Sequence, residues 1–284
     1  MKIYVPPIKC QGIKTKLVQW IKAHADLPSG GRWIEPFMGS GVVGFNLRPH
    51  AAIFADVNPH IVNFYNAMKH GQVTAARAKA FLEKEGALLT QKGEAHYYAL
   101  RDRFNEGGDP FDFLFLSRAC FNGLIRFNKK GRYNVPFGHK PRRFAQAYVT
   151  KIANQIRYVE SAIQQYDWSF VCADFRAVMR EAGERDFLYC DPPYMGRHAD
   201  YYSAWSDREE EALYQHLSTM PTPFMLSTWH SNRYRRNTTL DRYASQFTVF
   251  TREHFYHVGP SEDHRHAMLE AIVLNYVPVA LDHA

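Results

Sequence analysis

The residues with the clearest chemical potential form the tetrapeptide Asp191-Pro192-Pro193-Tyr194, which directly follows the apolar run 187–190. A carboxylate at the carboxyl end of a parallel strand lies where open α/β sheets bind their ligands. The two prolines fix φ and remove backbone donors, so the loop is stiff and the Pro192 carbonyl has no competing N–H beside it. Asp191 and this carbonyl can each accept one N–H bond from an amino group conjugated to an aromatic ring, and Tyr194 offers a face for that ring.

The alternative for this tetrapeptide is a plain strand-exit turn, since Asp and Pro are both common turn residues. At average composition, the tetrapeptide should occur by chance in roughly one chain in a thousand of this length. Two acceptors on one amino group would pull the nitrogen lone pair out of conjugation with the ring. The predicted chemistry is therefore a reaction at a ring amino group.

A second candidate site is the glycine turn that follows the predicted strand 32–36, reading Glu35-Pro36-Phe37-Met38-Gly39-Ser40-Gly41. Its glycines allow the backbone to approach a ligand closely. A dinucleotide-binding turn is the competing interpretation, but the third glycine of G-x-G-x-x-G is not in its place, and no lysine follows to form a P-loop. Asp56 ends the next predicted strand, where an acid can accept hydrogen bonds from ribose hydroxyls.

The third predicted strand, 169–172, is followed by Asp174 and Phe175. Asp174 could accept the amino group of an adenine, and Phe175 could pack on the adenine ring. A role for Asp174 as the N-cap of a following helix fits almost equally well.

The helices and strands that must position these residues indicate an α/β fold. A helix over 11–23, the strand 32–36, a helix from Val42 broken at Pro49 and the strand 51–56 form the mononucleotide-binding half of a doubly wound sheet. Helical patterns then dominate, around a basic loop over 121–143, and the sheet resumes with five strands, of which 169–172 is the first. The predicted helices are 61–69, 73–85, 95–104, 111–120 and 150–165, and the later strands are 186–190, 224–228, 247–251 and 271–276. We therefore predict a catalytic domain from residues 1–58 and 166–284 with a mainly helical insertion, 59–165.

Bulk properties narrow the class of protein. The 284 residues carry a formal charge of +7, which weakly favours a polyanionic partner. Cys10, Cys120, Cys172 and Cys190 form no C-x-x-C pair, so neither a disulfide framework nor a thiol zinc site is expected. The N-terminus lacks the apolar run of a signal peptide, and no stretch approaches 18 apolar residues. We expect a cytoplasmic protein without a membrane span.

The glycine turn is followed by the helical insertion and then by Asp-Pro-Pro-Tyr. In this order of motifs, and over nearly its whole length, the chain resembles the Dam-like, alpha-group adenine-N6 DNA methyltransferases. Longer runs carry the resemblance and are nearest to the EcoRV-type modification methyltransferases: VPPIK from Val5, QGIKTKL from Gln11, IEPFMGSGVV from Ile34, the stretch 120–137, RFAQAY from Arg143, DPPYMGRH from Asp191 and EHFYHVG from Glu253. The resemblance implies a Rossmann-like fold, S-adenosylmethionine over the turn 37–41, methyl transfer to N6 of an adenine flipped out of duplex DNA, and an insertion that recognises the target.

For the cofactor, Lys14 and Gly12 could reach the methionine carboxylate, although solvated lysines on an amphipathic helix show the same spacing. Dam has Trp-Ala where this chain has Cys10-Gln11, so the resemblance leaves open how the cofactor adenine is covered and whether the target is the same. Together with the residues derived above, the resemblance assigns to the cofactor site Cys10, Gly12, Lys14, Glu35, Pro36, Phe37, Gly39, Ser40, Gly41, Asp56, Asn58, Asp174, Phe175 and Asp191.

For DNA, the segment 121–138 resembles the family's DNA-reading hairpin, and Phe121 stands where Dam-like enzymes have a tyrosine that wedges into the base stack. Arg126 can make a bidentate contact with guanine, and Leu124 and Pro136 can meet a thymine methyl. Lys129, Lys130, Arg132, Lys140, Arg142 and Arg143 form a basic collar suited to phosphates. A solvated basic loop is the other interpretation. The expected DNA contacts are Lys9, which enters only through the resemblance, Phe121, Asn122, Gly123, Leu124, Arg126, Asn128, Lys129, Lys130, Asn134, Pro136, Arg142 and Arg143.

Several readings remain beside this one. Methylation of cytosine N4, of an RNA adenine or of a protein glutamine uses similar amino-group chemistry, and a DNA-binding module without catalysis is a different class. The shared hairpin favours a target that begins GAT, as in GATC or GATATC, read by a monomer or by a dimer on a palindrome, with a restriction nuclease as a possible partner. A zinc site at His254, His257, His264 and His266 is disfavoured against a surface hairpin, because no thiol lies nearby, so no metal is expected.

Overall fold

The computed structural model describes residues 2–194, 205–255 and 267–278. Within them lies a seven-stranded sheet in the order β3-β2-β1-β4-β5-β7-β6, in which β7 runs antiparallel to both β5 and β6 and the other described pairs are parallel. This is a Rossmann-like order with an antiparallel strand near one edge, and it confirms the predicted fold class. The strands are β1 (Trp33–Glu35), β2 (Ala51–Asp56), β3 (Asp167–Cys172), β4 (Phe187–Cys190), β5 (Phe224–Asn232), β6 (Thr248–Phe255) and β7 (Ala267–Leu274).

The order of the strands reverses between β1 and β4, and ligands bind in the crevice outside the carboxyl ends of strands at such a switch point. Trp33 pairs with Phe187 and Ile34 with Leu188, so the two strands end at nearly the same level. Every residue of both strands is buried, as expected of central strands covered on both faces. The glycine turn after β1 and the Asp191 tetrapeptide after β4 therefore emerge side by side.

Successive side chains of each strand point to opposite faces of the sheet, so the strands contribute to two hydrophobic cores, one on each face. Trp33, Phe187 and Tyr189 pack in the core on one face, with α1 (Val18–His24) and α2 (Val42–Leu47). Ile34 and Leu188 pack in the core on the other face. The helices of that face are α8 (Phe175–Arg180), α9 (Asp207–Thr219) and α10 (Thr239–Ala244).

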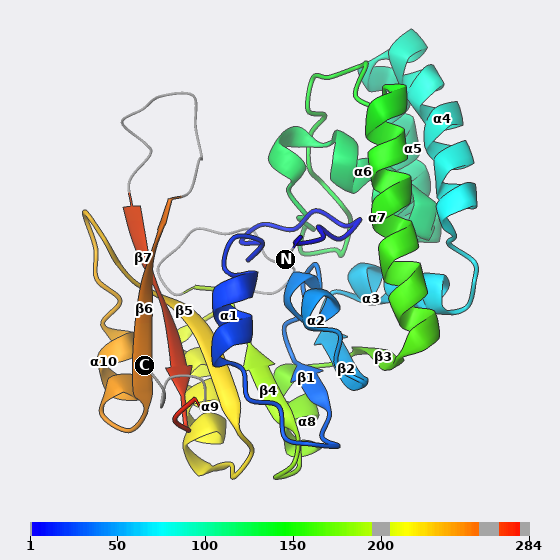
Figure 1. The fold of residues 1–284 in the computed structure, drawn as a ribbon. Helices are drawn as coiled ribbons and strands as arrows, with labels where there is room; N and C mark the ends of the chain where they lie inside the picture. The colour runs from blue at the N-terminus through cyan, green and yellow to red at the C-terminus, as the bar shows by residue number, and fades with distance from the viewer. Residues whose placement is uncertain (1, 195–204, 256–266, 279–284) are drawn as a thin grey trace.

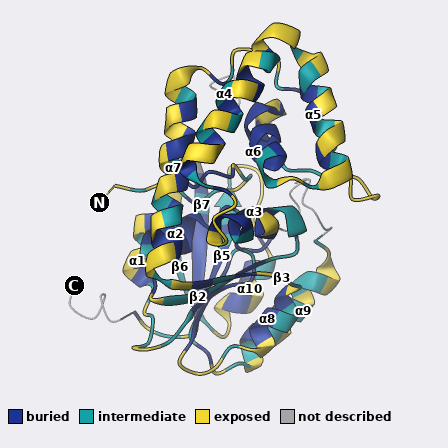
Figure 2. Ribbon diagram, turned by 90° about the vertical axis from the view of Figure 1, so that its right-hand side faces the viewer, coloured by how far each residue is buried: buried dark blue, intermediate teal, exposed yellow. Residues whose placement is uncertain are grey.

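The insertion is helical, as predicted, and stands to one side of the sheet (Figure 1). Asn58, Thr74 and Asp109 cap three of its helices with their side chains. Most of α6 is buried, and Figure 2 shows the exposed outer faces of α4, α5 and α7 around it. The helices are α3 (Pro59–Lys69), α4 (Ala75–Lys92), α5 (Glu94–Gly107), α6 (Pro110–Ala119), the short 3-10 turn η1 (Phe121–Gly123) and α7 (Gln146–Gln165).

The insertion and the sheet share one core, because α3 lies against β2 and β3. The side chains of Asn66 and Lys69 donate hydrogen bonds to the carbonyls of Phe170 and Trp168, at 3.1 and 2.6 Å. The division of the chain at residues 58/59 and 165/166 stays a prediction. In the described structure, α3 belongs with the sheet as much as with the insertion.

Two expectations for the helices differ from the structure. The predicted helix over 11–23 begins only at Val18, because Gly12 has φ 72° and the segment before Val18 turns Lys14 inward. The helices α9 and α10 were not predicted, although Ser206 and Glu209 form a capping box at the start of α9. None of the helices among the described residues has the length and apolar character needed to cross a bilayer.

Candidate active site and nucleic-acid interface

Asp191 leaves the carboxyl end of β4 and meets Lys14 from the N-terminal segment. The ammonium of Lys14 lies 2.7 and 2.9 Å from the two carboxylate oxygens, and the Lys14 side chain is only 3% exposed. Burial raises the pKa of Asp191, and the charge and hydrogen bonds of Lys14 oppose that rise. Lys14 therefore favours the ionised carboxylate, which is the form that accepts hydrogen bonds. Sequence reasoning placed Lys14 near the cofactor but did not foresee this ion pair.

Tyr194 is held from two sides. Its hydroxyl donates a hydrogen bond to the carboxylate of Glu270 on β7 at 2.8 Å, and the Lys14 ammonium lies 4.8 Å from the centre of its ring. Glu270 is fully buried, and its charge adds to the rise in the pKa of Asp191. Sequence reasoning missed Glu270. The available signal was a lone acid within the apolar run 268–274, since a buried charge requires a partner.

The glycine turn after β1 leaves space for a ligand. Gly39 has φ 49°, and a Cβ built on it would meet no atom within 4 Å. Its amide donates to the Asp56 carboxylate at 2.9 Å, and the amide of Asn58 donates to the other oxygen at 2.8 Å. Burial raises the pKa of Asp56. An open backbone turn beside a fixed carboxylate offers the space and the acceptor that a nucleoside-containing cofactor requires.

Several predicted cofactor residues form the frame of this turn. Glu35 is 2% exposed, and its Oε1 accepts hydrogen bonds from the Trp33 indole and the Gly44 amide, both at 2.7 Å. Burial raises the pKa of Glu35 to about 8. Pro36 and Ser40 are also buried, and the side chain of Asn58 caps α3. In the described structure these side chains fix the shape of the glycine turn. Gly41, at φ 72°, is followed directly by α2.

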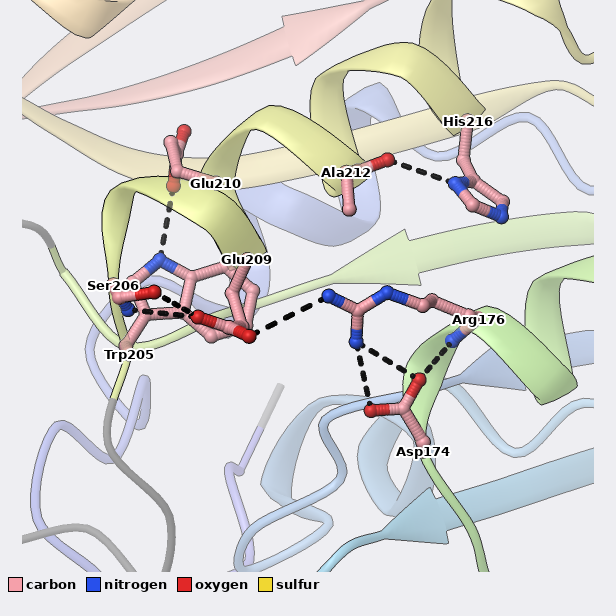
Figure 3. Close-up of polar contacts among 8 residues, drawn as sticks. All are labelled: Asp174, Arg176, Trp205, Ser206, Glu209, Glu210, Ala212 and His216. Atoms are coloured by element: carbon pink, nitrogen blue, oxygen red, sulfur yellow. Dashed lines mark hydrogen bonds and ion pairs between the residues drawn. The ribbon is translucent and has the colours of Figure 1, made fainter.

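At the end of β3, the structure shows the helix-cap role that was the alternative for Asp174 (Figure 3), and the adenine contact stays a prediction. Asp174 caps α8, accepting from the Arg176 amide at 2.9 Å, and it pairs with the Arg176 guanidinium at 3.0 Å. Phe175 is 2% exposed and packs against Phe37 and Trp205, with ring centres 5.3 and 5.6 Å away. The helix-cap interpretation of Asp174 is what the structure shows. Phe175 is therefore covered, whereas Phe37 is partly exposed.

The N-terminal segment passes between the sheet and the insertion (Figure 1). The buried guanidinium of Arg118 on α6 donates to the carbonyls of Pro6 and Pro7, which fixes the segment to the insertion. Burial and the charge of Asp56 both raise the pKa of the Cys10 thiol. The Gly12 carbonyl accepts from Lys14 at 3.2 Å. Sequence reasoning missed Arg118, a charged residue inside the apolar run 111–120.

The predicted DNA-reading loop is closed by isolated antiparallel bridges, Cys120 with Phe137 and Phe127 with Tyr133. Phe121 follows the bridging residue Cys120 at the base of this loop and is 46% exposed. Lys9, which lies more than a hundred residues away in the sequence, reaches the same place, where its ammonium is 3.4 Å from the Asn122 carbonyl. The structure thus brings Lys9 together with Phe121, Asn122 and Gly123. Leu124 is half-buried beside them, and Pro136 is exposed.

The charged residues of this region fall into two groups. Arg126 is held by Asn134, whose side-chain oxygen lies 2.9 Å from Arg126 Nε, and Arg143 donates to the Tyr148 hydroxyl at 2.8 Å while stacking on its ring. Asn128 caps the turn by accepting from the Lys130 and Arg132 amides. Residues with exposed side chains form the other group and suit phosphate contacts: Lys129, Lys130, Arg132, Lys140 and Arg142.

No group of three metal-ligating side chains occurs among residues 2–194, 205–255 and 267–278. His254, on β6, is half-buried, and burial lowers its pKa. His257, His264 and His266 lie outside the described residues, as do the motif residues 195–198 and 256–259.

Comparisons with known proteins agree with this geometry. The family model described as D12 class N6 adenine-specific DNA methyltransferase matches residues 11–258. The chain is 35% identical over 194 residues to a DNA adenine methylase of Serratia marcescens, and 31% identical over 204 residues to a Retron Ec67 DNA adenine methylase of Escherichia coli. These matches cover 66% and 69% of this chain, and the chain spans 66% of each relative's length, slightly under two thirds.

A solved structure, the rRNA methyltransferase aviRa from Streptomyces viridochromogenes, matches over 95% of this chain and 87% of its own, with 16% identity and a TM-score of 0.36. The family match implies S-adenosylmethionine as the methyl donor. It covers most of the chain, including the glycine turn, the insertion and Asp191. The chain therefore belongs to the D12 class of N6 adenine-specific DNA methyltransferases.

Proposed function

We propose that this protein transfers a methyl group to N6 of an adenine that is flipped out of duplex DNA. The observation that carries the proposal is the meeting of Asp191, Lys14 and Tyr194 beside the glycine turn, at the switch point of the sheet. S-adenosylmethionine, when bound there, supplies an activated methyl on a sulfonium. The other parts of the reaction belong to side chains of this chain.

The proposed chemistry follows from hydrogen bonding. An ionised Asp191 and the Pro192 carbonyl accept the two N–H groups of the target adenine, and Tyr194 stacks on its ring. With both N–H bonds held, the nitrogen lone pair turns out of conjugation toward the methyl. Lys14 keeps Asp191 in its accepting form, and Glu270 fixes the Tyr194 hydroxyl. No general base is required, because the proton can leave after the transfer.

We further propose that residues 59–165 recognise the target. Phe121 wedges into the gap left by the flipped adenine. The residues that read bases are Lys9, Asn122, Leu124, Arg126 and Pro136. The position of Lys9 beside Asn122 supports its place among the readers. The exposed basic side chains around the loop bind phosphates.

The proposed target begins GAT, as in GATATC or GATC, because the longer runs resemble EcoRV-type and Dam-like enzymes. We propose that the protein acts in the cytoplasm as a monomer, with dimer formation on a palindromic site and pairing with a restriction nuclease as further possibilities.

Product analysis tests the proposal. Duplex DNA containing every hexamer is incubated with the protein and labelled S-adenosylmethionine, digested to nucleosides and analysed by mass spectrometry, and modified positions are mapped by sequencing. We expect N6-methyladenine at one short site beginning GAT. N4-methylcytosine would assign the chain to the related cytosine chemistry. The absence of any methylated base, with DNA binding retained, would instead make the chain a binding module.

A further inference from the structure

A short basic segment at the end of β5 carries the most exposed large aromatic side chain of the described residues. The segment is Arg233-Tyr234-Arg235-Arg236, and the ring of Tyr234 is 71% exposed. All three arginines are also exposed. No acidic residue lies within the segment. Nothing in the proposed catalytic site or in the insertion uses this surface.

The segment is held in a rigid turn. The Asn232 amide donates to the Arg235 carbonyl at 2.8 Å, and the Asn232 side chain accepts from the amides of Tyr234 and Arg235, both at 2.8 Å. Below it, the Asn237 amide donates to the His230 carbonyl at 2.8 Å, and the buried Asn237 side chain bonds to the Trp229 carbonyl. A partner that binds these side chains therefore need not order the backbone.

The turn stands on the ligand side of the sheet. Leu226 of β5 lies opposite Cys190 of β4, next to Asp191. Six more residues carry β5 to Asn232, about 20 Å beyond that level at the usual rise of a strand. In Figure 1 the connection that follows β5 lies on the left of the molecule, across the carboxyl edge of the sheet from the helical insertion. The turn and the loop 121–138 therefore flank the candidate active site from opposite sides.

The chemistry of the turn fits a nucleic-acid backbone. Arginine guanidiniums bind phosphates through several donors, and an exposed tyrosine can donate to a phosphate or stack on a sugar or base. Arg233 and Arg235 stand on either side of the exposed Tyr234 in the sequence, and Arg236 pairs with Asp241 at 2.5 Å. A solvated basic loop is the competing outcome.

We propose that residues 233–236 form a second DNA-contact element, which binds the duplex backbone on the flank of the target opposite the loop 121–138. The inference rests on the proposed function, since it takes duplex DNA as the partner. A duplex would then be held at both ends of the site while the adenine between them is extracted.

The first test measures the salt dependence of binding. The double variant Arg233→Ala/Arg235→Ala is compared with Arg180→Ala, which removes an exposed arginine at the end of α8, at the foot of the sheet in Figure 1. If both arginines bind phosphates, the slope of log Kd against log salt should flatten by about two units, equally for target and non-target duplexes. Arg180→Ala should keep the wild-type slope. A double variant with the wild-type slope would overturn the inference.

The second test locates the contact. Binding is measured on duplexes shortened from either side of the target. The double variant should lose its difference from the wild type once one flank, and only that flank, is trimmed. An equal difference on the shortest duplexes would place the arginines elsewhere. Methylation of DNA by the wild type is checked in parallel: if it fails, the proposed function fails, whereas intact methylation with unchanged slopes removes only the second contact element.

Discussion

The proposed catalytic site and the proposed DNA-binding loop differ in how far their side chains are buried. At the carboxyl edge of the sheet, Asp191, Lys14, Tyr194 and Glu270 are linked by short contacts in largely buried positions. The loop 121–138 instead exposes Phe121 and most of its basic side chains.

This difference follows from what each region must bind. An amino group that reacts needs acceptors fixed before it arrives, so burial and ion pairing are useful there. A DNA surface varies in sequence and carries water and counterions, so exposed side chains can adjust to it. Variants at the sheet edge should therefore change the rate and its pH dependence, and variants in the loop should change affinity and specificity.

The largest effect outside Asp191 itself should come from Lys14→Met. It leaves the Asp191 carboxylate without its cation, which should destabilise the fold by about 2–4 kcal/mol, a cost moderated by the partial exposure of Asp191. Because Lys14 lowers the pKa of Asp191, its loss should raise that pKa. Activity requires the ionised form, so the acid limb of the rate profile should move to higher pH. The measurement is the single-turnover rate from pH 5 to 9.

Glu270→Gln is the matched control, since it keeps a hydrogen-bond acceptor for Tyr194 and removes a charge that raises the pKa of Asp191. Its acid limb should move to lower pH, opposite to that of Lys14→Met. Shifts in the same direction, or no shift in either variant, would show that Asp191 does not titrate in the rate.

In the loop, Arg126→Ala should cost about 1–3 kcal/mol at a single base pair and relax discrimination there. Lys130→Ala should weaken binding to all sequences alike and flatten the salt slope by about one unit. Asn134→Ala should partly reproduce the Arg126 effect, because Asn134 holds that guanidinium. Methylation of duplexes with every single-base change measures all three. Identical specificity profiles for Arg126→Ala and Lys130→Ala would contradict the assignment of Arg126 to base recognition and of Lys130 to phosphate binding.

The smallest effect concerns stability at the glycine turn. The pKa of Glu35 is about 8 in the folded protein against an ordinary value of 4.5, so the folded state holds a proton that the unfolded chain has released between these values. The free energy of unfolding should therefore fall as pH rises through this window, by up to about 1.4 kcal/mol per pH unit.

Glu35→Gln should flatten this slope, as measured by urea unfolding at pH 5, 6.5 and 8. Asp186→Asn is the control, because Arg32 and backbone amides hold the pKa of Asp186 below its ordinary value, outside the window. A Glu35→Gln slope equal to that of the wild type would mean that Glu35 is ionised in the folded protein.

The sequence was sufficient to predict the described strands, because apolar runs bounded by turns mark buried parallel strands clearly. The helices of the insertion were also predictable from caps and periodicity. The helix before β1 was not, since its first predicted turns are unwound around Gly12 by the contact of Lys14 with Asp191. That contact joins residues 177 positions apart, and local patterns carry no record of it.

The candidate site was predictable where motif and strand end coincide, as at Asp191 and Gly39. Glu270 and Arg118 were missed because their importance depends on tertiary partners, Tyr194 for one and the carbonyls of Pro6 and Pro7 for the other. Asp174 shows the reverse case. Its place after a strand favoured a ligand contact almost as strongly as a cap, and in the described structure its carboxylate caps α8.

The most direct test of the central claim is single-turnover methyl transfer by Asp191→Ala, run beside a calorimetric titration with S-adenosylhomocysteine. Losing one of two fixed acceptors at the reacting nitrogen should slow the transfer by about 100-fold or more, by analogy with the loss of one preorganised hydrogen-bonding group at other catalytic sites. The cofactor product should still bind, since Gly39 and Asp56 are untouched. Transfer at a rate close to that of the wild type, with binding intact, would contradict the assignment of Asp191 to the chemistry.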